Sequence, residues 1–271
     1  MKERVVTRIQ SIGIILAIIT TAAIGGAAWY LSKPVLTPTP TATPEPTYPQ
    51  TQTYIVHKLQ GELTIDADWN KEVWQGVEPL QLNYYMGEKP EHFPKTEVKL
   101  LYDDENIYVI FRVEDQYVRA VAQNYHGRVW EDSCVEFFFT PGSDIKEGYF
   151  NLEMNCGGTF LFCHQTARGE NVKYVEISDC QRVEAAHSLP KIVYPEIKEP
   201  VTWVVEYRIP IDILEKYANV TRPAPGVVWR ANFYKCGDKT SHPHWLTWSP
   251  VDNPTPDFHL PQYFGVLSFT D

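Results

Sequence analysis

The sequence lacks the short motifs that mark common enzyme classes. It has no G-x-S-x-G nucleophile elbow, no H-E-x-x-H zinc motif, no phosphate-binding loop and no G-x-G-x-x-G dinucleotide fingerprint. Serine hydrolases, zinc peptidases and nucleotide-dependent enzymes are therefore disfavoured. Glycoside hydrolases need only two carboxyl groups about 5–10 Å apart, so Glu131, Asp132 and Glu136 leave a glycoside hydrolase or lyase open as an alternative.

Basic residues are also scarce. The chain has 24 Lys and Arg against 34 Asp and Glu, and its formal net charge is −10. Residues 1–53 hold more basic than acidic residues, so the remainder of the chain is more acidic still. An acidic surface repels phosphate backbones and anionic lipid head groups. We therefore expect no nucleic-acid partner and favour neutral or cationic ligands.

Charge is absent between Ile9 and Ser32. This stretch has the length of a membrane span, which takes about 20 apolar residues, and exceeds the ~7–15-residue apolar region of a signal peptide. Basic residues precede it, which places that flank in the cytoplasm and the rest of the chain outside. Residues 1–33 are predicted to be a signal anchor, with a cleaved signal peptide as the alternative. The protein is expected to be extracytoplasmic, either membrane-anchored or secreted.

Residues 34–53 combine repeated prolines with threonines and show no apolar periodicity. This composition is typical of an extended, polyproline-like stalk, which spans ~3.1 Å per residue when fully extended. The predicted role of the stalk is to hold residues 54–271, a single domain, away from the membrane.

Residues 54–271 show strand patterns separated by turns. β-Branched and aromatic residues are concentrated in these segments, and in several of them apolar residues alternate with polar ones. The patterned segments are residues 98–115, 149–166, 201–209, 227–236 and 263–269. Only residues 211–217 have a helical pattern. Many short strands predict an all-β fold in a single domain, either a β-sandwich or a closed barrel.

The chain has five cysteines, an odd number for an exported protein. The Gly157–Gly158 dipeptide predicts a two-residue hairpin turn, which places Cys156 opposite Thr159 and Cys163 opposite Leu152. The two thiols then lie about 13 Å apart along the strands, too far for a disulfide. Buried free thiols, or a bridge between more distant segments, remain open.

Two kinds of metal site are considered. His242 and His244, with His259 downstream, are the transition-metal candidates, but Pro243 indicates a loop rather than a shared strand face. Structural calcium suits an exported β-sandwich better. Its candidate ligands lie in predicted turns, where Asp is also common without a metal; they are Asp66, Asp68, Asp103, Asp104 and Asp115.

The tryptophans carry the most functional information. Those in apolar or alternating contexts are predicted to be core residues: Trp69, Trp74, Trp203 and Trp229. Trp130, Trp245 and Trp248 lie in polar, loop-like surroundings and are predicted to be exposed. An exposed indole beside carboxylates and amides suits a sugar, because the apolar face of the ring stacks on the indole while the hydroxyls form hydrogen bonds.

Over about residues 60–271 the domain resembles the family 9 carbohydrate-binding modules, within the broader group of DOMON-like β-sandwiches. Ordered blocks carry the resemblance: LTIDADWNKEVW, VKLLYDDENIYVIFRVED, VWEDSCVEFFFTP, WVVEYRIP, HPHWLTWSP and PDFHLPQYFGVLSF. It implies a single antiparallel β-sandwich of the jelly-roll or DOMON-like kind. It also implies a non-catalytic module that binds an oligosaccharide or polysaccharide between two tryptophans, with a nearby acid bonding the sugar hydroxyls. It also implies a structural calcium ion.

Carried over by position, the resemblance gives Trp130 as the first clamp, Glu136 as the acid and Trp248 as the second clamp, with Trp245 as the alternative. Six residues span about 20 Å along a straight strand, so Trp130 is expected on a loop that folds back over the strand. The family pattern has an Arg near Asn155, where this sequence offers none through residue 158. Asn155 is taken instead as a candidate ligand-binding residue at this place. Recognition of reducing ends is therefore left open.

A related DOMON-like branch binds haem through Met and His. Here Met154 with His244 or His259 is the candidate pair, although none of the three methionines lies in a recognised haem motif. A haem-binding domain therefore stands beside the hydrolase as an alternative to the sugar-binding module.

Overall fold

Strands separated by turns run through residues 51–271, the part of the chain that the computed structural model describes. The predicted anchor over residues 1–33 and nearly all of the predicted stalk lie outside the described residues. No helix in the described part is both long and apolar enough to cross a membrane.

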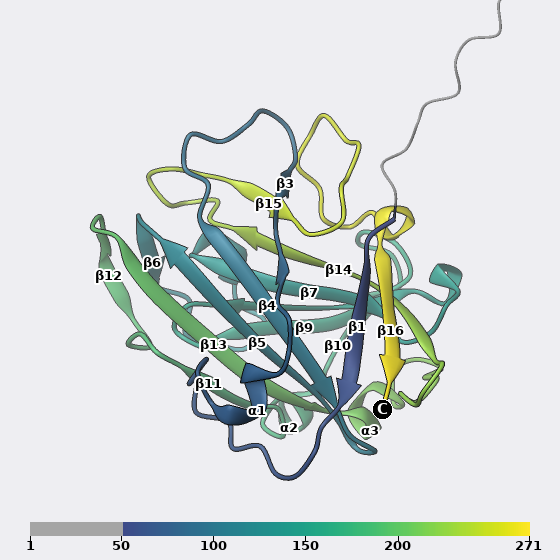
Figure 1. Ribbon diagram of the computed structural model, residues 1–271. Coiled ribbons are helices and arrows are strands. Elements are labelled where there is room, and N and C mark those ends of the chain that lie inside the picture. The colour runs from purple at the N-terminus through teal and green to yellow at the C-terminus, as the bar shows by residue number, and fades with distance from the viewer. Residues whose placement is uncertain (1–50) are drawn as a thin grey trace, which may run out of the picture. The chain divides into compact units, whose positions relative to one another are not determined.

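The strands form two packed layers, so the predicted all-β sandwich is confirmed. One layer contains, in spatial order, β10 (Lys173–Tyr174), β9 (Phe160–Gln165), β8 (Tyr149–Asn155), β7 (Cys134–Thr140) and β14 (Val228–Cys236). The other contains β16 (Gly265–Thr270), β1 (Thr53–Lys58), β4 (Lys95–Tyr102), β5 (Asn106–Asp115), β13 (Val201–Pro210) and β11 (Glu184–His187). Figure 1 shows β4, β5 and β13 crossing over β7, β9 and β14. Pairing of β14 with β16 joins the layers.

Shorter elements complete the fold. Three short strands extend the main sheet: β2 (Leu80–Gln81), β3 (Tyr84–Tyr85) and β15 (Trp245–Thr247). A separate two-stranded sheet pairs β6 (Val118–Ala120) with β12 (Val193–Ile197). The helical segments are single turns: α1 (Glu72–Gln75), η1 (Val129–Glu131), η2 (Ile145–Glu147), α2 (Ile177–Cys180), α3 (Ile211–Leu214) and η3 (Pro261–Tyr263).

The main core lies between the two layers. Alternating residues of β13, among them Trp203 and Tyr207, point into it as predicted and are fully buried. Phe137 of β7 stacks on Phe233 of β14, and Phe233 in turn meets Phe111 of β5 with ring centroids 6.1 Å apart. Aromatic side chains bury 150–250 Å² each, so the contact of Phe233 with Phe111 joins two large buried side chains across the layers.

The outer face of β5 and β13 is buried as well, which the sequence pattern did not predict. The segment around α1 covers it and packs the fully buried Trp74 against Ile110. Glu206 of β13 points to the same face and is fully buried. It accepts hydrogen bonds from Trp74 Nε1 (2.8 Å), Ala67 N (2.8 Å) and Lys71 Nζ (2.8 Å). These hydrogen bonds offset the cost of burying the Glu206 carboxylate between the sheet and the α1 segment.

β1 departs from the predicted antiparallel arrangement. It runs parallel to β16, with Thr53 opposite Val266, and parallel to β4, with His57 opposite Leu101. The other strand pairs within residues 51–271 are antiparallel. The first strand of the domain therefore lies inside the sheet, beside the last strand (Figure 1).

The turn between β8 and β9 has three residues rather than the predicted two. Asn155 N donates to Thr159 O (2.9 Å), and Gly158 has a φ of 78°, the left-handed conformation that glycine adopts readily. Cys163 therefore lies opposite Asn151, not opposite Leu152 as predicted. All five cysteines of the chain are free and buried.

Candidate functional site

A cavity of about 400 Å³ opens on the face of β7, β8, β9 and β14 that points away from the main core. Strand alternation sends Glu136, Glu153 and Cys236 to this face, while their chain neighbours point into the core. Loop residues form the walls, and the cavity is lined by Trp130, Glu136, Asn151, Glu153, Leu161, Cys163, Gln165, Arg168, Gly169, Val172, Tyr174, Cys236, Asp238, Trp245, Pro256, Asp257, Phe258 and His259.

Two tryptophans border the cavity. Trp130 lies on η1, in the connection that leads into β7, and Trp245 begins β15; both are half-buried. Trp245 Nε1 donates to Asp238 Oδ1 (2.8 Å), and Asp238 N donates to Trp130 O (3.1 Å). Asp238 therefore links the two segments that carry the indoles. The structure brings Trp130 and Glu136 to one cavity, and it does so by placing Trp130 on a turn outside the strand.

Two carboxyl groups lie side by side on the floor. Glu136 of β7 is only 2% exposed and lies directly opposite Glu153 of β8. Glu136 Oε1 accepts from Cys236 Sγ (3.2 Å), and Glu153 Oε1 accepts from Asn151 Nδ2 (2.8 Å). Burial raises the pKa of both groups, that of Glu153 to about 7 and that of Glu136 well above its ordinary range. Nearby Cys236, Glu153 and Asp238 raise the pKa of Glu136 further.

Neither glutamate has a cationic partner in the described part of the chain, where the interactions of both are hydrogen bonds to Asn or Cys. Two buried acids without a countercharge favour the protonated form. A protonated carboxyl group both donates and accepts hydrogen bonds. This floor can therefore donate a hydrogen bond to a ligand hydroxyl or accept one from it.

Amide and imidazole groups complete the polar lining. Asn151 Oδ1 accepts from Gln165 Nε2 (2.9 Å), and Gln165 Nε2 also lies 3.2 Å from His259 Nδ1. Burial lowers the pKa of His259 to about 4, so its imidazole is neutral at pH 7. At the rim the largely exposed Arg168 forms an ion pair with Asp257 (3.0 Å). An Arg therefore reaches the cavity from the segment after β9 rather than from residues 155–158.

Trp248 does not border the cavity. It is 5% exposed, and its ring packs in the main core with its centroid 5.7 Å from that of Phe233. It also covers Gly265, where an added Cβ would lie 2.5 Å from the indole. The prediction that Trp248 is exposed and closes the clamp is therefore wrong. Positions three apart in an extended chain point to opposite faces, so Trp245 at the cavity places Trp248 in the core.

Asn155 also lies outside the cavity. It is fully buried, and its side-chain oxygen accepts from Gly157 N (3.2 Å) and Thr159 N (2.9 Å). Its amide nitrogen donates to Asp132 Oδ2 (2.9 Å). Asn155 therefore shapes the β8–β9 turn, and its predicted contact with a ligand does not agree with this position.

The five aspartates considered for calcium are not gathered into one site. Their partners are side chains or turn backbone: Lys71 for Asp66 (2.6 Å), Asn70 N for Asp68 (2.9 Å), Glu105 N for Asp103 (2.8 Å), Lys58 for Asp104 (2.6 Å), and Lys235 for Asp115 (3.3 Å). Within residues 51–271, three donor atoms of His, Cys, Asp or Glu converge within 4.8 Å only at Cys134, Glu136 and Cys236. Calcium binding stays a prediction.

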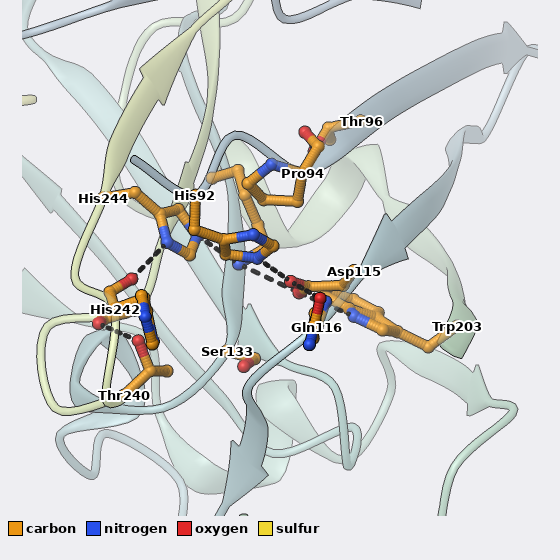
Figure 2. A network of polar contacts seen from close by, with 12 residues as sticks. His92, Pro94, Thr96, Asp115, Gln116, Ser133, Trp203, Thr240, His242 and His244 are labelled. Carbon is orange, nitrogen blue, oxygen red and sulfur yellow. Dashed lines mark hydrogen bonds and ion pairs between the residues drawn. The ribbon is translucent and has the colours of Figure 1, made fainter. Parts of the chain in front are cut away.

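A second buried polar group lies on the core side of β14. Lys235 Nζ lies 3.3 Å from Asp115 Oδ2 and 2.7 Å from His244 Nε2, and His92 Nε2 lies 2.7 Å from Asp115 Oδ1. Figure 2 shows His92 and Trp203 pointing toward Asp115, with His244 beside His92. Burial, with Lys235 adding to it, lowers the pKa of His244 to about 3, so His244 is neutral and accepts from Lys235. We call Lys235, Asp115, His92 and His244 the Lys235 cluster.

The residues considered for a transition metal or for haem have different surroundings, although the rings of His242 and His244 both lie beside that of His92, with centroids 6.4 and 5.3 Å away. His259 borders the cavity, His244 belongs to the Lys235 cluster, and His242 stacks on Tyr117 with ring centroids 3.6 Å apart. Met154 points into the main core, on the face of β8 opposite Glu153. Within the described residues, no three convergent donor atoms of His, Cys, Asp or Glu include these histidines.

Comparisons with known proteins agree with this architecture. Residues 65–269 match carbohydrate-binding family 9. A Bacteroides uniformis protein, for which carbohydrate binding is a proposed role, is 30% identical with a TM-score of 0.73, covering 81% of this chain and 99% of that one. No curated protein matches the chain.

Two further structures share the fold at 16% identity and a TM-score of 0.55. Both are of a family 9 carbohydrate-binding module from Caldicellulosiruptor kristjanssonii, one in complex with cellotriose and one with glucose. They cover 81% and 80% of this chain, and 94% and 95% of their own chains. With the family match extending over most of its length, the chain belongs to carbohydrate-binding family 9.

Proposed function

We propose that the protein is a non-catalytic carbohydrate-binding module and that the cavity bordered by Trp130 and Trp245 is its sugar site. The observation that carries this proposal is the combination of two half-buried indoles with a floor of carboxyl and amide groups. Indoles offer stacking surface to the apolar face of a pyranose, and the floor offers hydrogen bonds to its hydroxyls. The glucose and cellotriose complexes of the Caldicellulosiruptor module support a ligand of this class.

The charge of the cavity favours a neutral sugar. Glu136 and Glu153 are buried acids without a cationic partner in the described residues, and Arg168 is already paired with Asp257. A sugar carboxylate or sulfate placed on this floor would meet like charge or force further proton uptake. Hydroxyl groups, in contrast, can donate to the ionised acids or accept from the protonated ones.

The test is a glycan array on the full-length protein, followed by calorimetric titration with the best glycan and with glucose and cellotriose. Trp130→Ala and Trp245→Ala should each lose stacking area worth ~1–3 kcal/mol, which is roughly tenfold to a hundredfold in affinity. Trp69→Ala is the matched control, because Trp69 is also half-buried but lies in the cluster under α1, away from the cavity. If Trp130→Ala and Trp245→Ala both bind like the wild type and like the Trp69→Ala control, the sugar site is elsewhere.

One observation favours a second candidate, a glycoside hydrolase. Glu131 pairs with Lys239 and Asp132 is fully buried under the backbone of residues 121 and 122, so the predicted acid set is not available together. Glu136 and Glu153, however, are directly opposite on antiparallel strands, where Cβ atoms lie about 4.5–5.5 Å apart. Side chains that start this close can bring their carboxyl groups to the separation of about 5–5.5 Å that retaining glycosidases use. Release of reducing sugar from the bound glycan, abolished in Glu153→Gln, would establish this alternative.

We further propose that the module is exported and held at the cell surface by residues 1–33 through the stalk at 34–53. Support comes from the uncharged run between Ile9 and Ser32, its basic flank, and the Pro/Thr composition that follows. Protease added to intact cells should release the domain by cutting in the stalk. A domain that stays protected until the cells are lysed would contradict this orientation.

A further inference from the structure

Metal-binding donor atoms converge at one corner of the cavity floor. Cys134, the first residue of β7, lies directly opposite Cys236, the last residue of β14, and Glu136 follows on the same face of β7. The two sulfur atoms and a carboxylate oxygen of Glu136 all lie within 4.8 Å of one another, and Cys236 Sγ is 3.2 Å from Glu136 Oε1.

This spacing matches the size of a tetrahedral zinc site. Zinc binds thiolate sulfur at about 2.3 Å and carboxylate oxygen at about 2.0–2.2 Å, which separates the donor atoms of a tetrahedron by about 3.4–3.8 Å. Cys236 Sγ and Glu136 Oε1, at 3.2 Å, are slightly closer than this range, and the other two separations are at most 4.8 Å. Side-chain adjustments of up to about 1 Å therefore bring the three donor atoms to zinc-binding distances. Two strands of the same sheet hold the three residues, and the backbone is therefore already arranged for such a site.

The charge balance points the same way. Cys134, Glu136 and Cys236 are all buried, with at most 2% of each residue exposed. Lys235, which precedes Cys236, points to the other face of β14 and contacts Asp115 and His244, so it supplies no countercharge to these three groups. A divalent cation would balance the charge of the deprotonated thiols and carboxyl group.

We propose that Cys134, Glu136 and Cys236 bind one zinc ion, with its fourth coordination position facing the cavity. On binding, each thiol releases a proton to solvent, as does the carboxyl group when it is protonated, and no electron is transferred. Glu136 and Cys236 line the cavity while Cys134 lies behind them. The open position is therefore accessible to water or to a hydroxyl of a bound ligand.

The same two cysteines could instead form a cross-strand disulfide. That bond would remove the thiol proton that Cys236 donates to Glu136 and would leave a buried carboxyl group without its partner in the described structure. An unsatisfied buried acid is costly, so the three-donor arrangement favours the metal.

The experiment uses the reduced, full-length protein in detergent, titrated with Zn²⁺ and separately with Cd²⁺. We expect one ion per chain, a cadmium–thiolate charge-transfer band in the ultraviolet, and protection of two thiols from alkylation. Cys134→Ser, Cys236→Ser and Glu136→Gln should each weaken binding at least about tenfold. Cys156→Ser is the matched control, because Cys156 is equally buried but packs in the main core, where its thiol contacts Arg119 O.

Melting curves separate lost metal binding from lost folding in these variants, and the wild-type spectrum reports thiolate coordination independently of any variant. The proposal is overturned if the wild type binds neither ion, or if binding occurs without a thiolate band. It is also overturned if Cys134→Ser and Cys236→Ser bind zinc as Cys156→Ser does, or if the protein purified without reductant holds a Cys134–Cys236 disulfide in place of two thiols.

Discussion

Two buried polar regions lie on opposite faces of the sheet at β14, and their charges are balanced in different ways. In the Lys235 cluster the lysine lies 3.3 Å from Asp115, and two histidines complete the contacts. In the cavity, Glu136 and Glu153 lie opposite each other with no cationic partner among the described residues. The first region is complete without a ligand, whereas the second is stable only with protons, a cation or ligand hydroxyls.

The two regions are neighbours in sequence. Lys235 and Cys236 are adjacent in β14, and strand alternation sends one to the core side and the other to the cavity. A buried charge pair thus indicates a structural role on one face of β14, and the buried acids Glu136 and Glu153 of β7 and β8 indicate a binding role on the other face.

The largest effect is expected from breaking the charge pair. Lys235→Met keeps the length of the side chain but leaves Asp115 buried without its lysine, which should lower the free energy of unfolding by about 3–5 kcal/mol. Urea unfolding followed by tryptophan fluorescence measures this loss. Lys239→Met is the control, since Lys239 is largely exposed and pairs with Glu131 at the surface. Equal stability of the two variants would show that the Lys235 cluster contributes no more than a surface ion pair.

In the cavity, the carboxyl group of Glu153 should make the free energy of unfolding depend on pH. The pKa of Glu153 is raised from 4.5 to about 7 in the folded protein, so the folded state holds this proton more tightly than the unfolded chain. Its contribution to stability is complete below pH 4.5 and is lost as the pH rises through 7. That amounts to about 3 kcal/mol. Glu153→Gln removes the contribution, and the difference in unfolding free energy between wild type and variant should change across this window.

The measured quantity is the difference in unfolding free energy between the wild type and Glu153→Gln. This difference is needed because the contribution of His244 to stability changes with pH in the opposite direction to that of Glu153. Its pKa falls from 6.5 to about 3 on folding, so stability from this group is complete above pH 6.5 and declines as the pH falls. Glu153→Gln leaves that contribution in place. A constant difference between wild type and Glu153→Gln from pH 4.5 to 7 would mean that Glu153 is ionised like an exposed carboxylate.

The smallest effect is expected at an exposed ion pair. Glu184 and Arg208 lie on neighbouring strands, 2.9 Å apart, with both side chains well exposed. Glu184→Gln should change the unfolding free energy by less than about 1 kcal/mol and should be insensitive to pH near neutrality. A loss as large as that of Lys235→Met would remove the distinction between buried and exposed pairs on which the comparison depends.

Local patterns predicted the strands well but their burial less well. The alternation in residues 201–209 correctly predicted that Trp203 and Tyr207 face the core. It could not show that Glu206, on the other face, is covered by the α1 segment, because that contact joins residues about 130 positions apart. The β8–β9 register was missed because the Asn155 side chain bonds the turn backbone and lengthens the turn.

The candidate site was predictable only in part. The order of sequence blocks led to Trp130 and Glu136, which the structure brings to one cavity. The choice between Trp245 and Trp248 depended on which face of the short strand β15 each residue occupies. Strand alternation places Trp245 and Thr247 on one face and Trp248, one residue further, on the other, which could have separated the two candidates. Arg168 and His259 lie in irregular segments that reach the cavity only through the packing of distant loops, so no local pattern marks them.

The parallel placement of β1 has a mechanical consequence. Thr53–His57 is bonded along its length to β16 on one side, and its last residues pair with β4 on the other. A pull on the chain at Thr53, resisted by the ligand proposed for the cavity, would run along the axis of β1. Such a load would shear the β1–β16 hydrogen bonds together instead of opening them one after another. The strand that follows the proposed stalk is therefore oriented to transmit tension into the sheet without peeling away from it.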